Sequence, residues 1–295
     1  MTIPDPVLAR QFLLQVITFV FSGYAIGVAP TILRGTARRG DPSLMAAMLL
    51  TVYAGLAAFD ARRDGVLTPL TTGDLPAMIG LAVLTTLLAL TLITALSGGL
   101  VSKVMPVVYG AAIPLLLIGS FSGGTVLGTF QLSAVALILL GIMMIESRTK
   151  SLRGQYWFFY AVGAMVLVSA TEWLRGAFFV TAPPAWLRFW QTAPAAVLAW
   201  LFALIGGKLR RFPSMPGRAY WSVPLAAVLF FAASYLRARI GTTYTFRGVI
   251  VPVSTVGLFC TLVTGRIHRH EKQPGSALFG MFLIIGALMI IANGL

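Results

Sequence analysis

Long apolar runs recur along this chain, and they constrain its fold more than any other feature. A helix needs about 20 mostly apolar residues to cross the hydrocarbon core of a bilayer. Ten such runs lie at residues 11–33, 43–59, 74–97, 100–120, 125–146, 156–180, 186–206, 219–236, 246–265 and 275–294. The sequence therefore predicts an all-α integral membrane protein with ten transmembrane helices and no soluble domain.

The composition agrees with a lipid-embedded protein. Charged residues make up 10% of the chain, against about 25% in ordinary soluble domains, and the mean hydropathy is +0.90. The net charge of +14 comes mainly from short gaps between apolar runs, which is typical of loops beside anionic lipid rather than of a nucleic-acid partner. The first run is too long for a cleaved signal peptide, so we count it as a span.

The second half of the sequence repeats features of the first half in the same order. Arg62-Arg63 in the first half matches Arg210-Arg211 in the second, and Pro76 matches Pro224. The segment 104–107 is then similar to 250–253, and the segment 140–145 is similar to 285–290. Each half holds five spans, and an odd number forces the second half to enter the membrane from the opposite side. We therefore predict two inverted five-helix repeats, residues 1–148 and 149–295.

These features together resemble the drug/metabolite transporter superfamily, in its EamA-like branch. The resemblance rests on the five-plus-five spans, the basic stop after the second span, and a proline in the fourth and ninth spans. The closing helices "LLGIMMI" and "IIGALMI" complete it, and it covers essentially the whole chain. It implies a cavity lined mainly by the first, third and fourth spans of each half. It also implies that the fifth and tenth spans are peripheral.

We accordingly predict a secondary transporter or exporter of a small metabolite or drug-like molecule, working by alternating access and not an enzyme. Gly206-Gly207-Lys208 lacks the spacing of a phosphate-binding loop, so ATP is not expected to drive it. The expected partners are a small-molecule substrate, with or without a coupling proton or ion, and the lipid of a bacterial inner (cell) membrane. Two alternatives stay open, namely an integral membrane enzyme acting on a lipid-linked substrate and a non-transporting assembly partner.

Ionisable side chains inside spans point to function because they are costly in lipid. Glu172 and Arg175 are three residues apart, so they share one helix face and can pair. Such a pair can face a cavity and open to a charged substrate, or it can fix helix packing or sit at the interface. In the alternative membrane enzyme, this pair would form the core of the site.

Other candidate substrate-binding residues are two tyrosines within spans and two basic residues that open spans. Tyr24 and Tyr109 carry hydroxyls that bind a ligand or are satisfied by packing, whereas Lys103 and Arg247 supply charge or anchor the helix at the interface. We predict a central cavity reached by both tyrosines and the Glu172–Arg175 pair, with Lys103 or Arg247 toward its mouths.

No metal or cofactor is expected. The lone Cys260 excludes a cysteine cluster, and His268 and His270 are interpreted as flanks of a basic loop. Trp190 and Gln191 stand where an interfacial aromatic belt is the default.

The basic residues also bear on orientation. Two alternating sets of loops hold fourteen and seven of them, and the smaller set is Arg10, Arg62, Arg63, Arg188, Arg237, Arg239 and Arg247. The positive-inside rule puts the larger set in the cytoplasm and both termini outside. The family resemblance implies that both termini are inside, and the sequence leaves this choice open.

Overall fold

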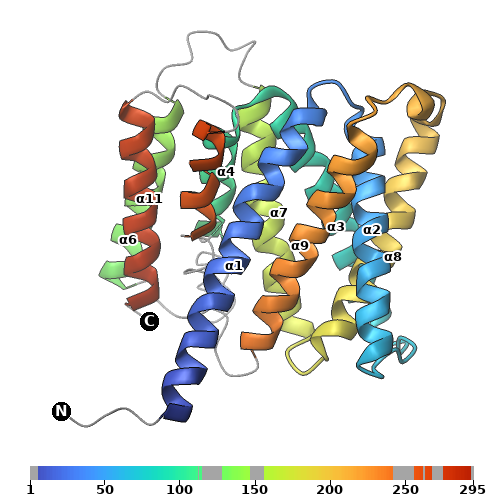
Figure 1. Ribbon diagram of the computed structural model, residues 1–295, viewed down its shortest axis with the longest axis horizontal. Coiled ribbons are helices and arrows are strands. Elements are labelled where there is room, and N and C mark those ends of the chain that lie inside the picture. Colours follow the sequence, from blue (N-terminus) through green and yellow to red (C-terminus); the bar gives the residue numbers. More distant parts are fainter. Residues whose placement is uncertain are drawn as a thin grey trace.

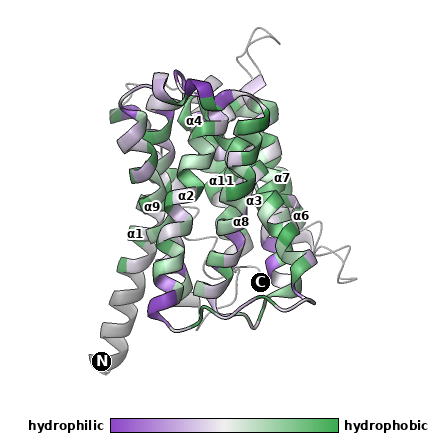
Figure 2. Ribbon diagram, turned by 90° about the vertical axis from the view of Figure 1, so that its right-hand side faces the viewer, coloured by the Kyte–Doolittle hydropathy of each residue, from purple (hydrophilic) through white to green (hydrophobic). Residues whose placement is uncertain are grey.

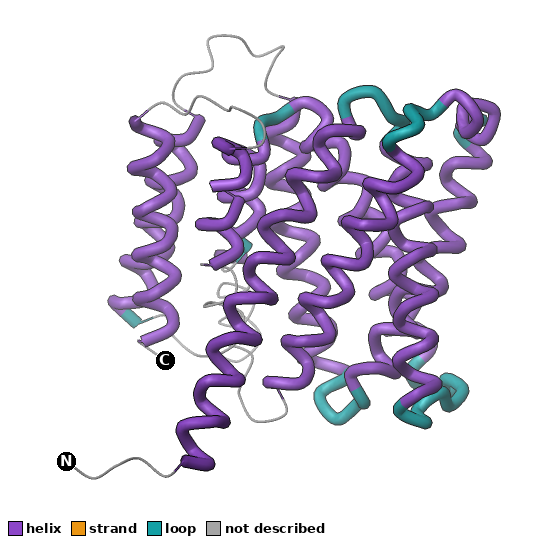
Figure 3. Tube along the Cα trace, in the orientation of Figure 1, coloured by secondary structure: helices purple, strands orange, loops and turns teal. Residues whose placement is uncertain are grey.

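The structure is a computed structural model that describes residues 6–111, 113–114, 128–146, 156–241, 256–261, 263–267 and 275–293. Within these residues every regular element is a helix (Figure 3). The residues Arg247, His268 and His270, which the sequence analysis discusses, lie outside the described part of the chain.

The helices follow the predicted apolar runs closely. Their bounds are α1 (Pro6–Ala37), α2 (Pro42–Arg63), α3 (Leu75–Gly98), α4 (Val101–Tyr109), α6 (Thr129–Glu146), α7 (Tyr156–Phe178), α8 (Pro184–Ile205), the 3-10 helix η2 (Lys208–Ser214), α9 (Ala219–Gly241) and α11 (Gly275–Asn293). Residues 256–261 and 263–267 are also helical, and we call them the 256–267 segment. Each of the ten predicted runs thus contains helical residues.

Five described helices are long and apolar enough to cross a membrane. They are Pro42–Arg63, Leu75–Gly98, Tyr156–Phe178, Pro184–Ile205 and Ala219–Ala238. Hydrophilic residues gather at the two ends of the bundle, and the hydrophobic stretches lie between them (Figure 2). The chain is therefore an α-helical, multi-pass membrane protein.

The helices pack as pairs whose members come from different halves of the sequence. The closest packing joins α6 to α11, α2 to α8, α1 to α9 and α3 to α7. The α6–α11 pair lies at one edge of the bundle and the α2–α8 pair at the other (Figure 1). The position of α6 and α11 agrees with the peripheral place that the family resemblance implies.

Local sequence signals fix two of the chain reversals. Asp41 is the N-cap of α2, and its carboxylate accepts a hydrogen bond from the Ser43 amide at 3.0 Å, with Pro42 in the first turn. The second reversal is at Gly99, since α3 ends at Gly98 and α4 begins at Val101. A Cβ on Gly99 would lie 2.5 Å from the Val104 side chain, so the hairpin needs glycine there.

Glycines also allow α6 and α11 to approach closely, as lipid-embedded helices require. A Cβ on Gly280 of α11 would lie 2.5 Å from the carbonyl oxygen of Gly141 on α6. A Cβ on Gly141 would likewise lie 2.5 Å from the carbonyl oxygen of Gly280. The sequence repeat matched Gly141 with Gly286 instead. Gly286 has open space beside it, so the two matched glycines occupy different surroundings.

This contrast gives a test with a control on the same helix. We expect Gly280→Ala to destabilise the protein by about 1–3 kcal/mol, because the added methyl group meets backbone atoms that cannot move aside. Gly286→Ala should be neutral or slightly stabilising, because alanine favours the helix and meets nothing. Thermal unfolding of both variants in one detergent measures the difference. Equal unfolding temperatures would show that α6 and α11 do not pack through this contact.

Candidate functional site

A buried polar stripe runs along one face of α8. Arg188, Gln191 and Thr192 are 7%, 2% and 5% exposed, and their spacing of three and four residues puts them on one side of the helix. The Thr192 hydroxyl donates to the Arg188 carbonyl oxygen, which keeps it satisfied within the helix. This stripe connects α8 to helices α2, α3, α7 and α9.

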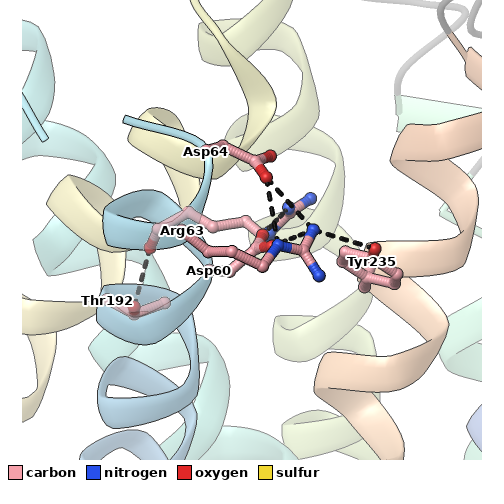
Figure 4. A network of polar contacts seen from close by, with 6 residues as sticks. Asp60, Arg63, Asp64, Thr192 and Tyr235 are labelled. Atoms are coloured by element: carbon pink, nitrogen blue, oxygen red, sulfur yellow. Dashed lines mark hydrogen bonds and ion pairs between the residues drawn. The ribbon is translucent and has the colours of Figure 1, made fainter. Parts of the chain in front are cut away.

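The strongest contact of the stripe is an ion pair between the two halves of the chain. Arg188 Nη2 donates to Asp60 Oδ2 at the end of α2, and both side chains are buried (Figure 4). The Arg188 guanidinium also lies 5.9 Å from the ring centres of Phe231 and Tyr235 on α9. Because this contact excludes water, aromatic faces add to the stabilisation that the carboxylate gives the cation.

Arg63 balances the charge of this cluster. Its Nη2 atom donates to Asp60 Oδ1 at 3.4 Å, to Asp64 Oδ1 at 3.1 Å and to the Tyr235 hydroxyl at 3.1 Å. Two carboxylates therefore face two guanidinium groups, and the cluster is neutral as a whole. Asp60 accepts from both arginines and so joins α2 to α8, while Arg63 extends the cluster to Tyr235 on α9 (Figure 4).

The predicted pairing of Glu172 with Arg175 is confirmed. Arg175 Nη1 donates to Glu172 Oε1 at 2.8 Å, and Arg175 Nε donates to Gln191 Oε1 at 2.9 Å. Gln191 Nε2 in turn donates to Thr85 Oγ1 at 2.6 Å. The pair thus belongs to a chain of bonds that joins α7, α8 and α3. Its side chains keep 20% and 29% exposure, so this end of the network reaches a solvated or lipid-facing surface.

Tryptophans on α8 close the same end of the bundle. The indole N–H groups of Trp186 and Trp190 both donate to the Thr68 carbonyl oxygen, each at 3.0 Å. Trp186 packs in a buried apolar cluster with Met78, Leu81 and Phe179. Trp190 therefore anchors the loop between α2 and α3, which its interpretation as an interfacial belt residue missed. We call the Asp60, Arg63, Arg188, Gln191 and Trp186 contacts together the lower contact layer.

The opposite end of the bundle carries a looser set of contacts between the halves. Asp41 Oδ2 lies 3.9 Å from Lys208 Nζ and 3.9 Å from Arg211 Nη1. The hydroxyls of Thr36 on α1 and Ser222 on α9 lie 3.2 Å apart. We call these contacts the upper contact layer. Both ion-pair distances exceed hydrogen-bond length, and Arg211 is largely exposed, so each pair contributes little to the stability of the fold.

Among the described residues, no hydrogen bond or ion pair joins Lys103, Tyr24 or Tyr109 to the Glu172–Arg175 pair. Lys103 Nζ is 6.0 Å from the Trp157 ring centre, at the other end of α7. Tyr24 is 49% exposed on α1. The Tyr109 hydroxyl is buried against Gly257 in the 256–267 segment. Of the predicted site residues that the structure describes, only Glu172 and Arg175 bond to each other directly, and the role of all these residues in binding substrate stays a prediction.

The lower contact layer was missed because its members stand at the ends of apolar runs. Asp60 directly follows the predicted run 43–59, and the charge count places Arg188 in a loop. That assignment of Arg188 is wrong, because the residue lies inside α8 and is buried. The useful signal was the helical spacing of Arg188 with Gln191 and Thr192, since three polar residues on one face predict a polar contact.

Comparisons with known proteins bear on the fold alone. No family model matches the chain, and no curated protein matches its sequence. Among 27 matching chains of solved structures is one crystal structure that aligns over 97% of this chain and 99% of its own, with a TM-score of 0.65 and 14% identity. The whole chain thus shares its fold with a solved protein of nearly the same length.

The buried ion pair makes a sharp prediction for stability. Asp60→Asn should lower the free energy of unfolding by about 3–5 kcal/mol, because it leaves Arg188 buried without a counter-charge. Asp64→Asn is the matched control four residues away, and its more exposed pair with Arg63 should contribute less than about 1 kcal/mol. Thermal unfolding in detergent compares the two. If both variants lose the same stability, the Asp60–Arg188 contact does not hold this end together.

Proposed function

We propose that this protein is a secondary transporter of the drug/metabolite transporter type, built from ten spans as two inverted repeats. It moves a small molecule by exposing a central site alternately at the two ends of the bundle. The observation that carries the proposal is that ion pairs between the halves stand at both ends of the bundle, Asp60–Arg188 in the lower layer and Asp41 with Lys208 and Arg211 in the upper layer. A protein that only anchors a partner has no need of two such layers.

The pairing of helices supports the repeat. In the predicted repeat, each helix of the first half corresponds to one of the second half: α1 to α7, α2 to α8, α3 to α9 and α6 to α11. The packed pair α1–α9 then corresponds to α7–α3, which is also packed. The α2–α9 pair likewise becomes the α8–α3 pair, while the α2–α8 and α6–α11 pairs become themselves. A pseudo-twofold axis produces this pattern, with α2–α8 and α6–α11 lying on it.

The helix directions support the inverted form of the repeat. The lower layer contains the end of α2 and the start of α8, through Asp60 and Arg188, whereas the upper layer contains the start of α2 and the residues that follow α8. The corresponding helices α2 and α8 therefore run in opposite directions. This is the arrangement of secondary transporters whose two halves rock about a central site.

The unequal strength of the two layers indicates which end is closed. The lower layer holds a buried ion pair, two indole hydrogen bonds and an apolar cluster, whereas the upper ion pairs are 3.9 Å long. In the proposed cycle the structure is the state that is closed below. Opening the lower end must break the Asp60–Arg188 pair, and closing the upper end would shorten the Asp41 pairs.

Flux measurements test the proposed function. The purified protein is reconstituted into liposomes loaded with a mixture of small metabolites, and the contents are followed by mass spectrometry. At least one compound should leave faster than from protein-free liposomes, with saturation at high concentration. If no compound moves but a lipid-linked compound is chemically changed, the protein is an enzyme and the proposal is wrong.

The Glu172–Arg175 pair gives a residue-level prediction for the same assay. Glu172→Gln should insert normally and reduce flux about tenfold, because an amide cannot replace the anionic partner of Arg175 when the pair opens. Asp74→Asn is the control, since the Asp74 carboxylate accepts a hydrogen bond only from Thr71 among the described residues. Unchanged flux in Glu172→Gln, with retained flux in the control, would remove the pair from the transport site.

A further inference from the structure

Exposed cations gather at the upper end of the bundle, where α8 ends. The turn between α1 and α2 meets the stretch from η2 to the start of α9 there, through the ion pairs of Asp41 and the hydrogen bond between Thr36 and Ser222. These two segments carry six basic side chains, of which five are exposed and one, Lys208, is partly buried. We call these six residues the basic surface: Arg38, Arg39, Lys208, Arg210, Arg211 and Arg218.

Acidic residues do not balance the charge of the basic surface. Among the described residues, Asp41 is the one carboxylate that forms an ion pair with any of the six cations. Its distances of 3.9 Å to Lys208 Nζ and to Arg211 Nη1 both exceed hydrogen-bond length. At the opposite end, the cluster around Asp60 holds as many carboxylates as guanidinium groups. The basic surface therefore keeps a positive charge that attracts an anionic partner.

The loop that carries four of these cations is folded against the bundle. Gly207 adopts a left-handed conformation with φ of 65°, which lets the chain turn from α8 into η2. The Phe212 ring centre lies 6.0 Å from that of Trp200 and 5.7 Å from that of Tyr220. The Tyr220 hydroxyl donates to the Phe212 carbonyl oxygen at 2.6 Å, and the Trp200 indole donates to Thr51 Oγ1 on α2 at 2.9 Å. The cations thus stand on a fixed backbone, and binding does not have to order the loop.

Large apolar side chains are exposed among the same cations. Ile205 at the end of α8 is 83% exposed, Leu209 of η2 is 36% exposed, and Trp221 at the start of α9 is 58% exposed. Basic and apolar side chains side by side are typical of a membrane interface, where the apolar groups enter the acyl region and the cations reach the headgroups. A soluble anion would contact the cations alone, so this combination favours a lipid.

We propose that the basic surface binds the phosphate groups of anionic phospholipids. The inference goes beyond the proposed transport function and does not depend on it, because a multi-pass protein meets lipid headgroups whatever it transports. Arginine and lysine side chains bind phosphate oxygens through charge-assisted hydrogen bonds. Each cation near an anionic membrane surface adds to the attraction. A free phosphate ion at such exposed cations would be held weakly, whereas a lipid adds the contacts of its acyl chains.

The proposed lipid site shares two cations with the upper contact layer. Lys208 and Arg211 face Asp41 in the structure, and a lipid phosphate competes with that carboxylate for both of them. Removing the charge of Asp41 should therefore strengthen lipid binding. Asp41→Asn does this and keeps the cap of α2, because asparagine caps a helix as well as aspartate does.

Native mass spectrometry of the purified full-length protein in a neutral detergent counts bound lipids and tests the proposal. Phosphatidylglycerol should bind saturably and at least about tenfold more tightly than phosphatidylcholine with the same acyl chains. Arg210→Gln leaves both Asp41 pairs in place and should weaken phosphatidylglycerol binding about fivefold. Replacing Lys208, Arg210 and Arg211 together by glutamine should weaken it about a hundredfold. Asp41→Asn should strengthen it about threefold.

Arg62→Gln is the matched control, because Arg62 is an exposed arginine at the other end of the bundle, and it should bind lipid like the parent. Without lipid, Arg210→Gln should unfold at the temperature of the parent, since its side chain is exposed. The proposal is wrong if the two lipids bind equally, if Arg210→Gln binds like the parent, if Arg62→Gln loses as much affinity, or if Asp41→Asn weakens binding. Glycerol phosphate that binds as tightly as the lipid would show a site for soluble anions, and tighter binding of polyglutamate would show a surface for an acidic protein. Either result also overturns the proposal.

Discussion

The ion pair between Asp60 and Arg188 is the contact on which the packing of this bundle depends. Both side chains are buried inside the protein, so each ionised group needs a counter-charge there. The pair satisfies this need across the two halves of the chain. Its arginine also contacts the aromatic rings of α9, and its helix face continues through Gln191 to α3 and α7. Helix α8 is consequently the element that connects four other helices, α2, α3, α7 and α9.

Burying such a pair is not an efficient source of stability, because desolvation offsets much of the attraction. A pair of apolar side chains of similar volume would hold the same helices at least as well. The ion pair differs from an apolar contact in how readily it can open. A charged contact separates into two groups that water or a substrate can solvate, whereas an apolar contact only loses area. This property suits a layer that must open in a transport cycle, and the loose ion pairs of Asp41 at the other end suit a layer that must close.

The sequence predicted the parts of the fold that depend on helix length and composition. All ten apolar runs contain helical residues, and Glu172 pairs with Arg175 because residues three apart share a helix face. Contacts between distant segments could not be predicted in this way. Asp60 and Arg188 are 128 residues apart, and each looks like an ordinary flank of its own span. Arg237 lies within the candidate membrane span Ala219–Ala238, although the charge count places it in a loop, since an apolar run ends at its first arginine.

Distances between spin labels across the two halves test the central claim, which is that the two contact layers open and close in opposition. With Cys260→Ala as background, labels at positions 62 and 181 report the lower end, and labels at 39 and 210 report the upper end. All four positions are exposed. The account predicts that Asp60→Asn shifts the lower pair to longer distances and the upper pair to shorter ones in the same sample. Distances that stay unchanged, or that lengthen at both ends together, would contradict it.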